Sequence, residues 1–183
     1  LFCYLLLLDL GVLAVAHWRR WPILAWLAFF GTAFLSAAWW VTWYDSEKFA
    51  ETVLFFTLLF LVFAFVPAVS ILTRRVVASQ WDGLLLFANG GLYGIALHDL
   101  LEANYQEWQG AMAVVLGLFH FGLGRWVRRW ETGDYYLQRT LTGLALLCWT
   151  VALPIQLDQQ WVTIGWAIEG ALLAILGWST GRR

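Results

Sequence analysis

Long apolar stretches separated by short polar turns fill this chain of 183 residues. They occupy residues 1–16, 23–43, 53–73, 83–97, 111–126, 137–157 and 162–178. A helix needs about 20 predominantly apolar residues to cross a bilayer, and tryptophans at the interface extend the reach of a shorter stretch. The pattern therefore predicts seven transmembrane helices, with the first one clipped at its start.

Pairs of adjacent arginines recur between these stretches with a nearly constant period. They stand at positions 19–20, 74–75, 128–129 and 182–183, at intervals of 55, 54 and 54 residues. One interval is long enough for two membrane-crossing helices and two short turns, which places every arginine pair on the same side of the bilayer. The sequence thus predicts an all-α integral membrane protein built from repeated two-helix hairpins of 54–55 residues.

The distribution of charge predicts how the chain is oriented. All ten arginines lie at the ends marked by the repeat, whereas Lys48 and most acidic residues lie in the opposite loops. Basic loops are retained in the cytoplasm, so we expect residue 1 outside and residue 183 inside. Tryptophans cluster at both predicted boundaries, as expected for rings that place an apolar face toward lipid and an N–H toward water.

Composition supports a membrane location and excludes an ordinary water-soluble core. Hydrophobic residues make up 62% of the chain and charged residues 13%, whereas soluble domains carry about 25% charge. A net charge of −1 gives no basic surface for nucleic acid. Because Leu1 opens inside an apolar run, we expect a single polytopic domain, residues 1–183, that is a portion of a longer protein. Its expected partners are the lipid bilayer, other membrane subunits or further copies of itself.

Two acidic residues stand at predicted depths where water is absent. Asp9 and Glu169 lie about 15 and 20 Å of helix rise from the cytoplasmic boundary, without a basic residue at that depth. Each should be neutral, or face the bundle interior and hydrogen-bond to a polar neighbour. The expected hydrogen-bond partners of the two acids on facing helices are Asn89, Tyr93, Thr32 and Thr142. Two interpretations remain open, a proton-linked or substrate-binding pair and a structural tie between helices.

Histidines supply the other candidate chemistry. His120 lies about 12 Å inside the cytoplasmic boundary and is best interpreted as a packed, hydrogen-bonded side chain, with proton relay or metal ligation as alternatives. His98, Asp99 and Glu102 cluster at an outer helix end. A solvated acidic loop is the favoured interpretation there, ahead of a weak metal site. We therefore expect neither a metal nor a cofactor.

Glycine and proline positions add detail to the predicted helices. The four-residue spacing of Gly90 and Gly94 favours close approach of a neighbouring helix. Pro67 and Pro154 each fall near one end of a span, where a missing backbone hydrogen bond costs least. The chain carries no nucleophile elbow, zinc-protease motif, phosphate-binding loop or dinucleotide fingerprint, so the sequence assigns no catalytic residue and does not favour an enzyme.

Two stretches of sequence carry a family resemblance. The first is residues 4–11 followed by Arg19-Arg20-Trp21, and the second is residues 154–158 with Trp161, Thr163 and residues 166–171. Together they resemble a large bacterial family of predicted membrane proteins known as domain of unknown function 2339. The resemblance implies a long polytopic protein of the bacterial inner membrane. It implies no activity, but Asp158 and Trp161 fall on its outer-loop motif, as Asp9 and Glu169 fall on its membrane motifs.

These features leave three candidate functions. The first is a structural or accessory membrane subunit, which the regular repeat and the absence of catalytic motifs favour. The second is a proton-linked transporter of a small molecule that uses Asp9 and Glu169. The third is a cell-envelope enzyme acting on glycan or lipid, for which the loops are short. A polar cavity that reaches Asp9 or Glu169 favours transport, and a dry bundle favours the accessory subunit.

Overall fold

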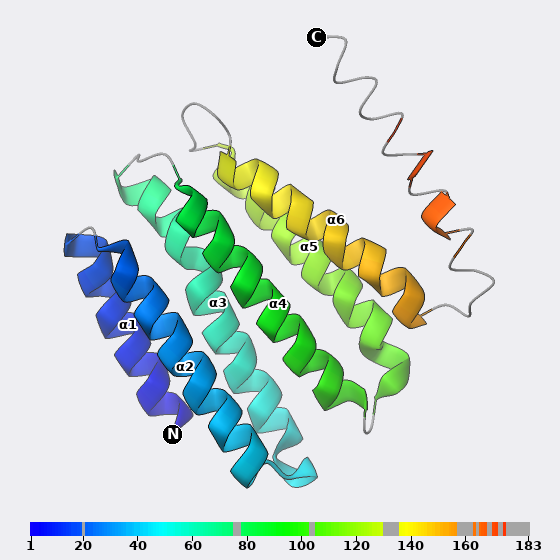
Figure 1. Cartoon of the computed structure of the whole chain (residues 1–183), viewed down its shortest axis with the longest axis horizontal. Helices are drawn as coiled ribbons and strands as arrows, with labels where there is room; N and C mark the ends of the chain where they lie inside the picture. The colour runs from blue at the N-terminus through cyan, green and yellow to red at the C-terminus, as the bar shows by residue number, and fades with distance from the viewer. Residues whose placement is uncertain are drawn as a thin grey trace.

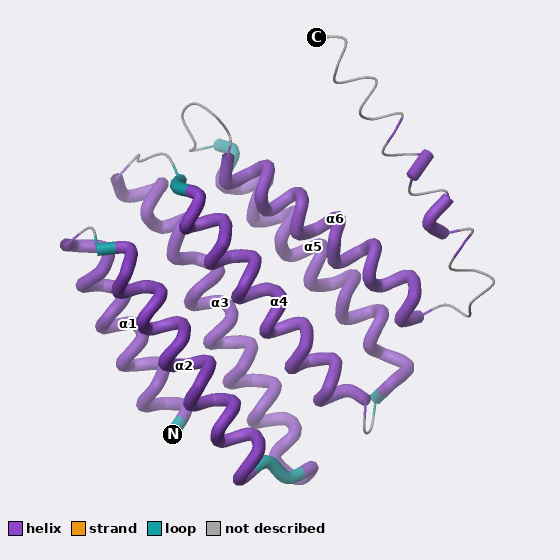
Figure 2. The backbone as a smooth tube through the Cα atoms, viewed as in Figure 1, coloured by secondary structure: helices purple, strands orange, loops and turns teal. Residues whose placement is uncertain are grey.

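The computed structural model describes residues 1–19, 21–74, 78–102, 105–129 and 136–156, together with positions 163, 165–167, 170, 171 and 174. Long helices account for most of these residues: α1 (Phe2–Arg19), α2 (Pro22–Trp43), α3 (Phe49–Arg74), α4 (Gln80–Glu102), α5 (Gln109–Val127) and α6 (Tyr136–Gln156). Two short 3-10 helices, η1 (Ser46–Lys48) and η2 (Gln106–Trp108), lead directly into α3 and α5. Within the described ranges there is no strand (Figure 2).

The long helices form three antiparallel pairs that lie side by side, α1 with α2, α3 with α4 and α5 with α6 (Figure 1). Further contacts join α1 to α3, and α4 to both α5 and α6. The C-terminal ends of α1, α3 and α5 lie at one end of the bundle, and the chain starts at the other. Arg19, Arg74 and Arg128 stand at those three helix ends, so the described arginines of the repeat share one end of the molecule.

Several helices combine the length and the composition that a membrane span requires. The segments are Phe2–Arg19, Ile23–Trp43, Ser46–Thr73, Gln80–Glu102 and Gln106–Val127. Large apolar side chains remain exposed in mid-helix, such as Leu7 at 72% and Phe34 at 74%, which suits contact with lipid and not with water. Most of the predicted seventh span, residues 162–178, lies outside the described residues. The described chain therefore supports an all-α membrane architecture with five candidate spans, while seven spans and superimposable repeats stay predictions.

Polar residues at the helix ends extend the helices beyond the predicted apolar stretches. Ser79 and Asp82 form a reciprocal cap at the start of α4, in which the Ser79 N–H donates to Asp82 Oδ2 at 2.7 Å and the Asp82 N–H to Ser79 Oγ at 3.4 Å. This cap satisfies donors that a helix start leaves unpaired, so α4 begins at Gln80. At the opposite end of the bundle, Lys48 Nζ donates to the Trp43 carbonyl at 2.9 Å and closes the end of α2.

The closest packing of two helices occurs between α5 and α6, and three glycines make it possible. Gly110, Gly117 and Gly124 are spaced by seven residues and all face α6. A Cβ at Gly117 would overlap the Trp149 indole and lie 3.1 Å from the Ala145 carbonyl oxygen, and one at Gly124 would lie 3.2 Å from Leu141 Cβ. Small residues at the interface allow helix backbones to approach in a membrane. This seven-residue spacing was not among the features predicted from the sequence.

The glycines of α4 behave differently from the prediction. A Cβ at Gly90 would meet the His120 ring at 3.3 Å, one at Gly94 would lie 4.0 Å from a Leu116 methyl, and one at Gly91 would meet nothing within 4 Å. No neighbouring backbone approaches them closely. Gly90, Gly91 and Gly94 instead line open space between α4, α5 and α6.

Candidate functional site

Asp9 is the only charged residue among the buried side chains of the described bundle. Its exposed fraction is 0%, and it lies on α1 among the buried residues Leu5 and Leu13. Thr32 on α2 donates its hydroxyl to both carboxyl oxygens, at 2.9 Å to Oδ1 and 2.7 Å to Oδ2. Thr32 is one of the four partners expected for Asp9 or Glu169. The hydrogen bond joins α1 to α2 in the interior of the bundle.

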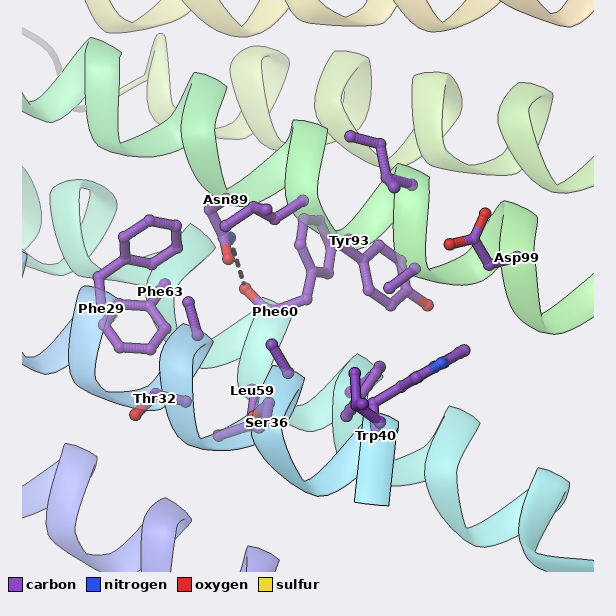
Figure 3. Close-up of a pocket in the computed structure, with 17 residues that line it drawn as sticks. Phe29, Thr32, Ser36, Trp40, Leu59, Phe60, Phe63, Asn89, Tyr93 and Asp99 are labelled. Atoms are coloured by element: carbon purple, nitrogen blue, oxygen red, sulfur yellow. Dashed lines mark hydrogen bonds between the residues drawn. The ribbon is translucent and has the colours of Figure 1, made fainter. Parts of the chain in front are cut away.

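A groove of about 280 Å³ lies next to this pair, between α2 and α4 with α3 as its floor (Figure 3). Its walls are mostly aliphatic and aromatic, with Phe29 and Phe63 at one end, Phe60 in the middle and Trp40 toward the other end. Asp9 does not line the groove, whereas Thr32 does. Thr32 therefore both hydrogen-bonds to the buried carboxyl group and lines the groove.

A small set of polar side chains interrupts the apolar lining. Asn89 is buried and donates its amide Nδ2 to the Phe60 carbonyl oxygen at 2.9 Å (Figure 3). Because carbonyl oxygens only accept, this assignment leaves the Asn89 side-chain oxygen as an acceptor for another group. Ser36 also lines the groove, and its buried hydroxyl has no hydrogen-bond partner among the described residues. The groove thus offers unused hydrogen-bonding groups in surroundings that are otherwise apolar.

Tyr93 completes the polar set on α4. Its hydroxyl lies 2.8 Å from the Thr57 hydroxyl, and Thr57 donates to the Val53 carbonyl oxygen at 2.7 Å. Since the Thr57 proton is already used, Tyr93 is the donor in this pair. Asn89 and Tyr93 were expected as partners of Asp9 or Glu169; neither bonds to Asp9, and both bond to α3. The fourth expected partner, Thr142, donates to the Gln138 carbonyl oxygen within its own helix.

His120 is fully buried at the contact of α3, α4 and α5. Its Nδ1 lies 2.8 Å from the Leu116 carbonyl oxygen, and its ring packs against Phe60 and Phe119 with centroids 5.8 and 5.5 Å apart. Its Nε2 is buried and has no hydrogen-bond partner in the part of the chain that the structure describes. The structure thus shows a packed histidine that is hydrogen-bonded through Nδ1, as expected, while Nε2 stays without a partner among the described residues.

Acidic and aromatic residues gather at the end of the bundle opposite the arginines. His98, Asp99 and Glu102 are exposed, and their possible ligand atoms lie within 4.8 Å of one another. Asp99 also lines the groove. Nearby in the groove wall, Trp40 stacks on Tyr44 with ring centroids 4.7 Å apart. Burial raises the pKa of the Tyr44 phenol, and the adjacent Asp45 carboxylate raises that pKa further, so the phenol stays neutral at physiological pH.

The remaining predicted site residues cannot be placed. Glu169, Asp158 and Trp161 lie outside the described residues, so the proposed pairing of Glu169 with Asp9 is not tested. The sequence pattern did not single out Ser36 or Thr57, because hydroxyl residues are common in membrane helices and usually bond to their own backbone. Only the packing of α2 and α3 against α4 shows that these two contribute to the groove and its surroundings.

Together, the apolar helices, the exposed lipid-compatible side chains and the buried polar pairs define a polytopic α-helical membrane protein. The family model of the predicted membrane proteins described as DUF2339 matches residues 1–183, and the chain belongs to this family. The resemblance noted in the sequence is thereby confirmed. No curated protein and no solved structure matches the chain.

Proposed function

We propose that this protein is a structural or accessory subunit of the bacterial inner membrane that packs against other membrane subunits. The observation that carries the proposal is the complete burial of Asp9 and its hydrogen bonding to Thr32. Its carboxyl group is fully buried, both oxygens accept from Thr32, and it lines neither the groove beside α2 nor the cavity beside His120. An intramembrane acid enclosed in this way ties helices together and has no open route to a substrate.

The groove between α2 and α4 is the surface proposed to receive a partner. Lipid tails make no use of hydrogen-bonding groups, yet the groove lining holds the spare acceptor of Asn89 and, just beneath its surface, the Ser36 hydroxyl without a partner among the described residues. Polar side chains of this kind hold transmembrane helices together, and an unpaired polar group facing hydrocarbon is costly. The proposed occupant is therefore a transmembrane helix of another subunit that carries small or polar residues on one face.

The test uses full-length protein purified from native membranes in mild detergent, with two matched tryptophan variants on α2. Ala37→Trp fills the groove, whereas Phe34→Trp changes a residue outside the groove lining that is 74% exposed. The proposal predicts a stoichiometric membrane partner that is retained by the wild type and by Phe34→Trp and is lost with Ala37→Trp. Equal recovery of co-purifying proteins from all three would contradict it.

A proton-linked transporter is the second candidate, and one contact favours it. Thr32 both bonds Asp9 and lines the groove, so rotation of this one side chain would connect the groove to the carboxyl group. The measurement is proton flux into proteoliposomes that contain the full-length protein. Transport requires that Asp9→Asn abolish a flux that the wild type shows, because an amide cannot exchange a proton. The accessory role predicts that both proteins leave the vesicles equally tight.

A further inference from the structure

A second cavity, of about 430 Å³, lies between α4, α5 and α6, whereas the groove proposed to receive a partner lies between α2 and α4. Gly90, Gly91 and Gly94 form its α4 wall, and the missing side chains at these positions create much of the space. Leu144, Leu147 and other aliphatic residues line the opposite wall on α6. At the end near the α4–α5 turn, the lining becomes more polar, with His98 and Gln109.

His120 is the polar group deep in this cavity. A backbone carbonyl can only accept, so the 2.8 Å contact with the Leu116 carbonyl oxygen places a proton on Nδ1. In the neutral ring, Nε2 then carries a lone pair and acts as an acceptor. Nε2 is directed at Gly90, which lies in the cavity wall, and has no partner among the described residues.

Neither water nor a lipid tail satisfies this arrangement. A stably bound water needs two to four polar partners, and the lining around His120 offers the single acceptor Nε2. An acyl chain matches the apolar walls but has no hydrogen-bond donor. The complementary molecule has an apolar body and one donor group, and small-molecule sites commonly combine apolar walls with a few polar groups in this way.

We propose that the cavity between α4, α5 and α6 binds a small apolar molecule that carries a hydroxyl group, and that this hydroxyl donates to His120 Nε2. At the polar end Gln109 Nε2 donates to the His98 carbonyl oxygen at 3.1 Å, and the exposed lining residues Phe87 and Ile95 open the cavity to the outside of the bundle. A side chain at Gly90 would press on the His120 ring, because its Cβ would lie 3.3 Å from Nε2.

The test compares 1-naphthol with naphthalene, which has the same apolar body and no donor. Binding to the full-length protein in lipid nanodiscs is followed by probe fluorescence, with empty nanodiscs as the partition blank. The wild type should bind 1-naphthol at least about fivefold more tightly than naphthalene, the effect of one buried hydrogen bond. His120→Phe keeps an aromatic ring and should remove this preference while it still binds naphthalene.

Two glycines provide a matched pair of variants. Gly90→Ala places a methyl group 3.3 Å from His120 Nε2 and should weaken 1-naphthol binding at least tenfold, whereas Gly122→Ala, outside the cavity lining, meets nothing within 4 Å and should bind like the wild type. Nitrogen-15 NMR of labelled histidine gives an independent readout, because the Nε2 resonance of His120 should shift with 1-naphthol and not with naphthalene. Equal affinities for the two probes in the wild type, or an unshifted Nε2 resonance at saturation, would overturn the proposal.

Discussion

Thr32 on α2 donates one hydroxyl to both carboxyl oxygens of Asp9 on α1, at 2.9 and 2.7 Å, in a part of the bundle where Asp9 is fully buried. The two residues are 23 positions apart in the sequence and lie on successive helices joined by a short turn. Their contact fixes how α1 lies on α2. It also separates the buried acid from the groove, since Thr32 stands between them.

Loss of the Thr32 hydroxyl should destabilise the bundle. Thr32→Val keeps the shape of the side chain but leaves a buried carboxyl group without its donor, at a cost of about 1–3 kcal/mol in the free energy of unfolding. The matched control is Thr42→Val on the same helix, where the exposed hydroxyl bonds only to the Ala38 carbonyl oxygen. Unfolding in mixed detergent micelles measures both. Equal stability of the two variants would show that the Asp9 contact contributes nothing.

Substitution of Asp9 separates hydrogen bonding from ionisation. Asp9→Asn keeps an acceptor for Thr32 and should fold with nearly wild-type stability, whereas Asp9→Leu removes the acceptor and should lose about 1–3 kcal/mol. The same unfolding measurement applies. A structural tie predicts this order, and a loss of folding in the Asn variant would indicate that the carboxyl group is needed for more than its hydrogen bond to Thr32.

The close contact of α5 and α6 should depend on Gly117. Gly117→Ala places a Cβ against the Trp149 indole and the Ala145 carbonyl oxygen, and overpacking of this kind costs about 1–3 kcal/mol. Gly122→Ala on the same helix meets nothing within 4 Å and should be neutral or slightly stabilising, because alanine favours the helix more than glycine. Comparison of the two unfolding free energies provides the check. Equal unfolding free energies of the two variants would contradict a tight contact between α5 and α6 at Gly117.

The orientation predicted from the arginines can be tested at two turns. In a variant without Cys3 and Cys148, single cysteines at Ser46 in η1 and at Gln80, the first residue of α4, lie at opposite ends of the bundle. An impermeant maleimide added to intact spheroplasts should label the cysteine at position 46 and leave the one at position 80 unlabelled until the membrane is permeabilised. Labelling of position 80 from outside would reverse the proposed topology.

Sequence periodicity was sufficient for the helices but not for their contacts. The apolar stretches predicted each described helix, and the arginines correctly indicated that α1, α3 and α5 end on the same side, because both signals depend on the bilayer itself. Helix lengths were underestimated where polar caps such as Ser79 and Asp82 extend a helix past its apolar part. Those caps are local and could have been recognised from their spacing.

The candidate site was only partly predictable for a different reason. Asp9 and His120 were identifiable because an ionisable residue inside hydrocarbon is rare. Their partners depend on how the helices rotate and pack, and that is why the sequence could offer Asn89 and Tyr93 as partners of the intramembrane acids but could not show that both bond to α3. The spacing of Gly110, Gly117 and Gly124 was a usable signal for the α5–α6 contact, whereas the closer pair Gly90 and Gly94 marks a cavity.

The most direct measurement of the proposed accessory role is site-specific photocrosslinking in native membranes. A benzoylphenylalanine at Ala37 faces the groove, and the same residue at Phe34 projects from α2 outside it. The account predicts one protein adduct of defined mass from position 37, lost when Ser36→Trp fills the groove, and lipid adducts alone from position 34. Lipid adducts alone from both positions would contradict the proposal that a transmembrane helix of another subunit occupies the groove.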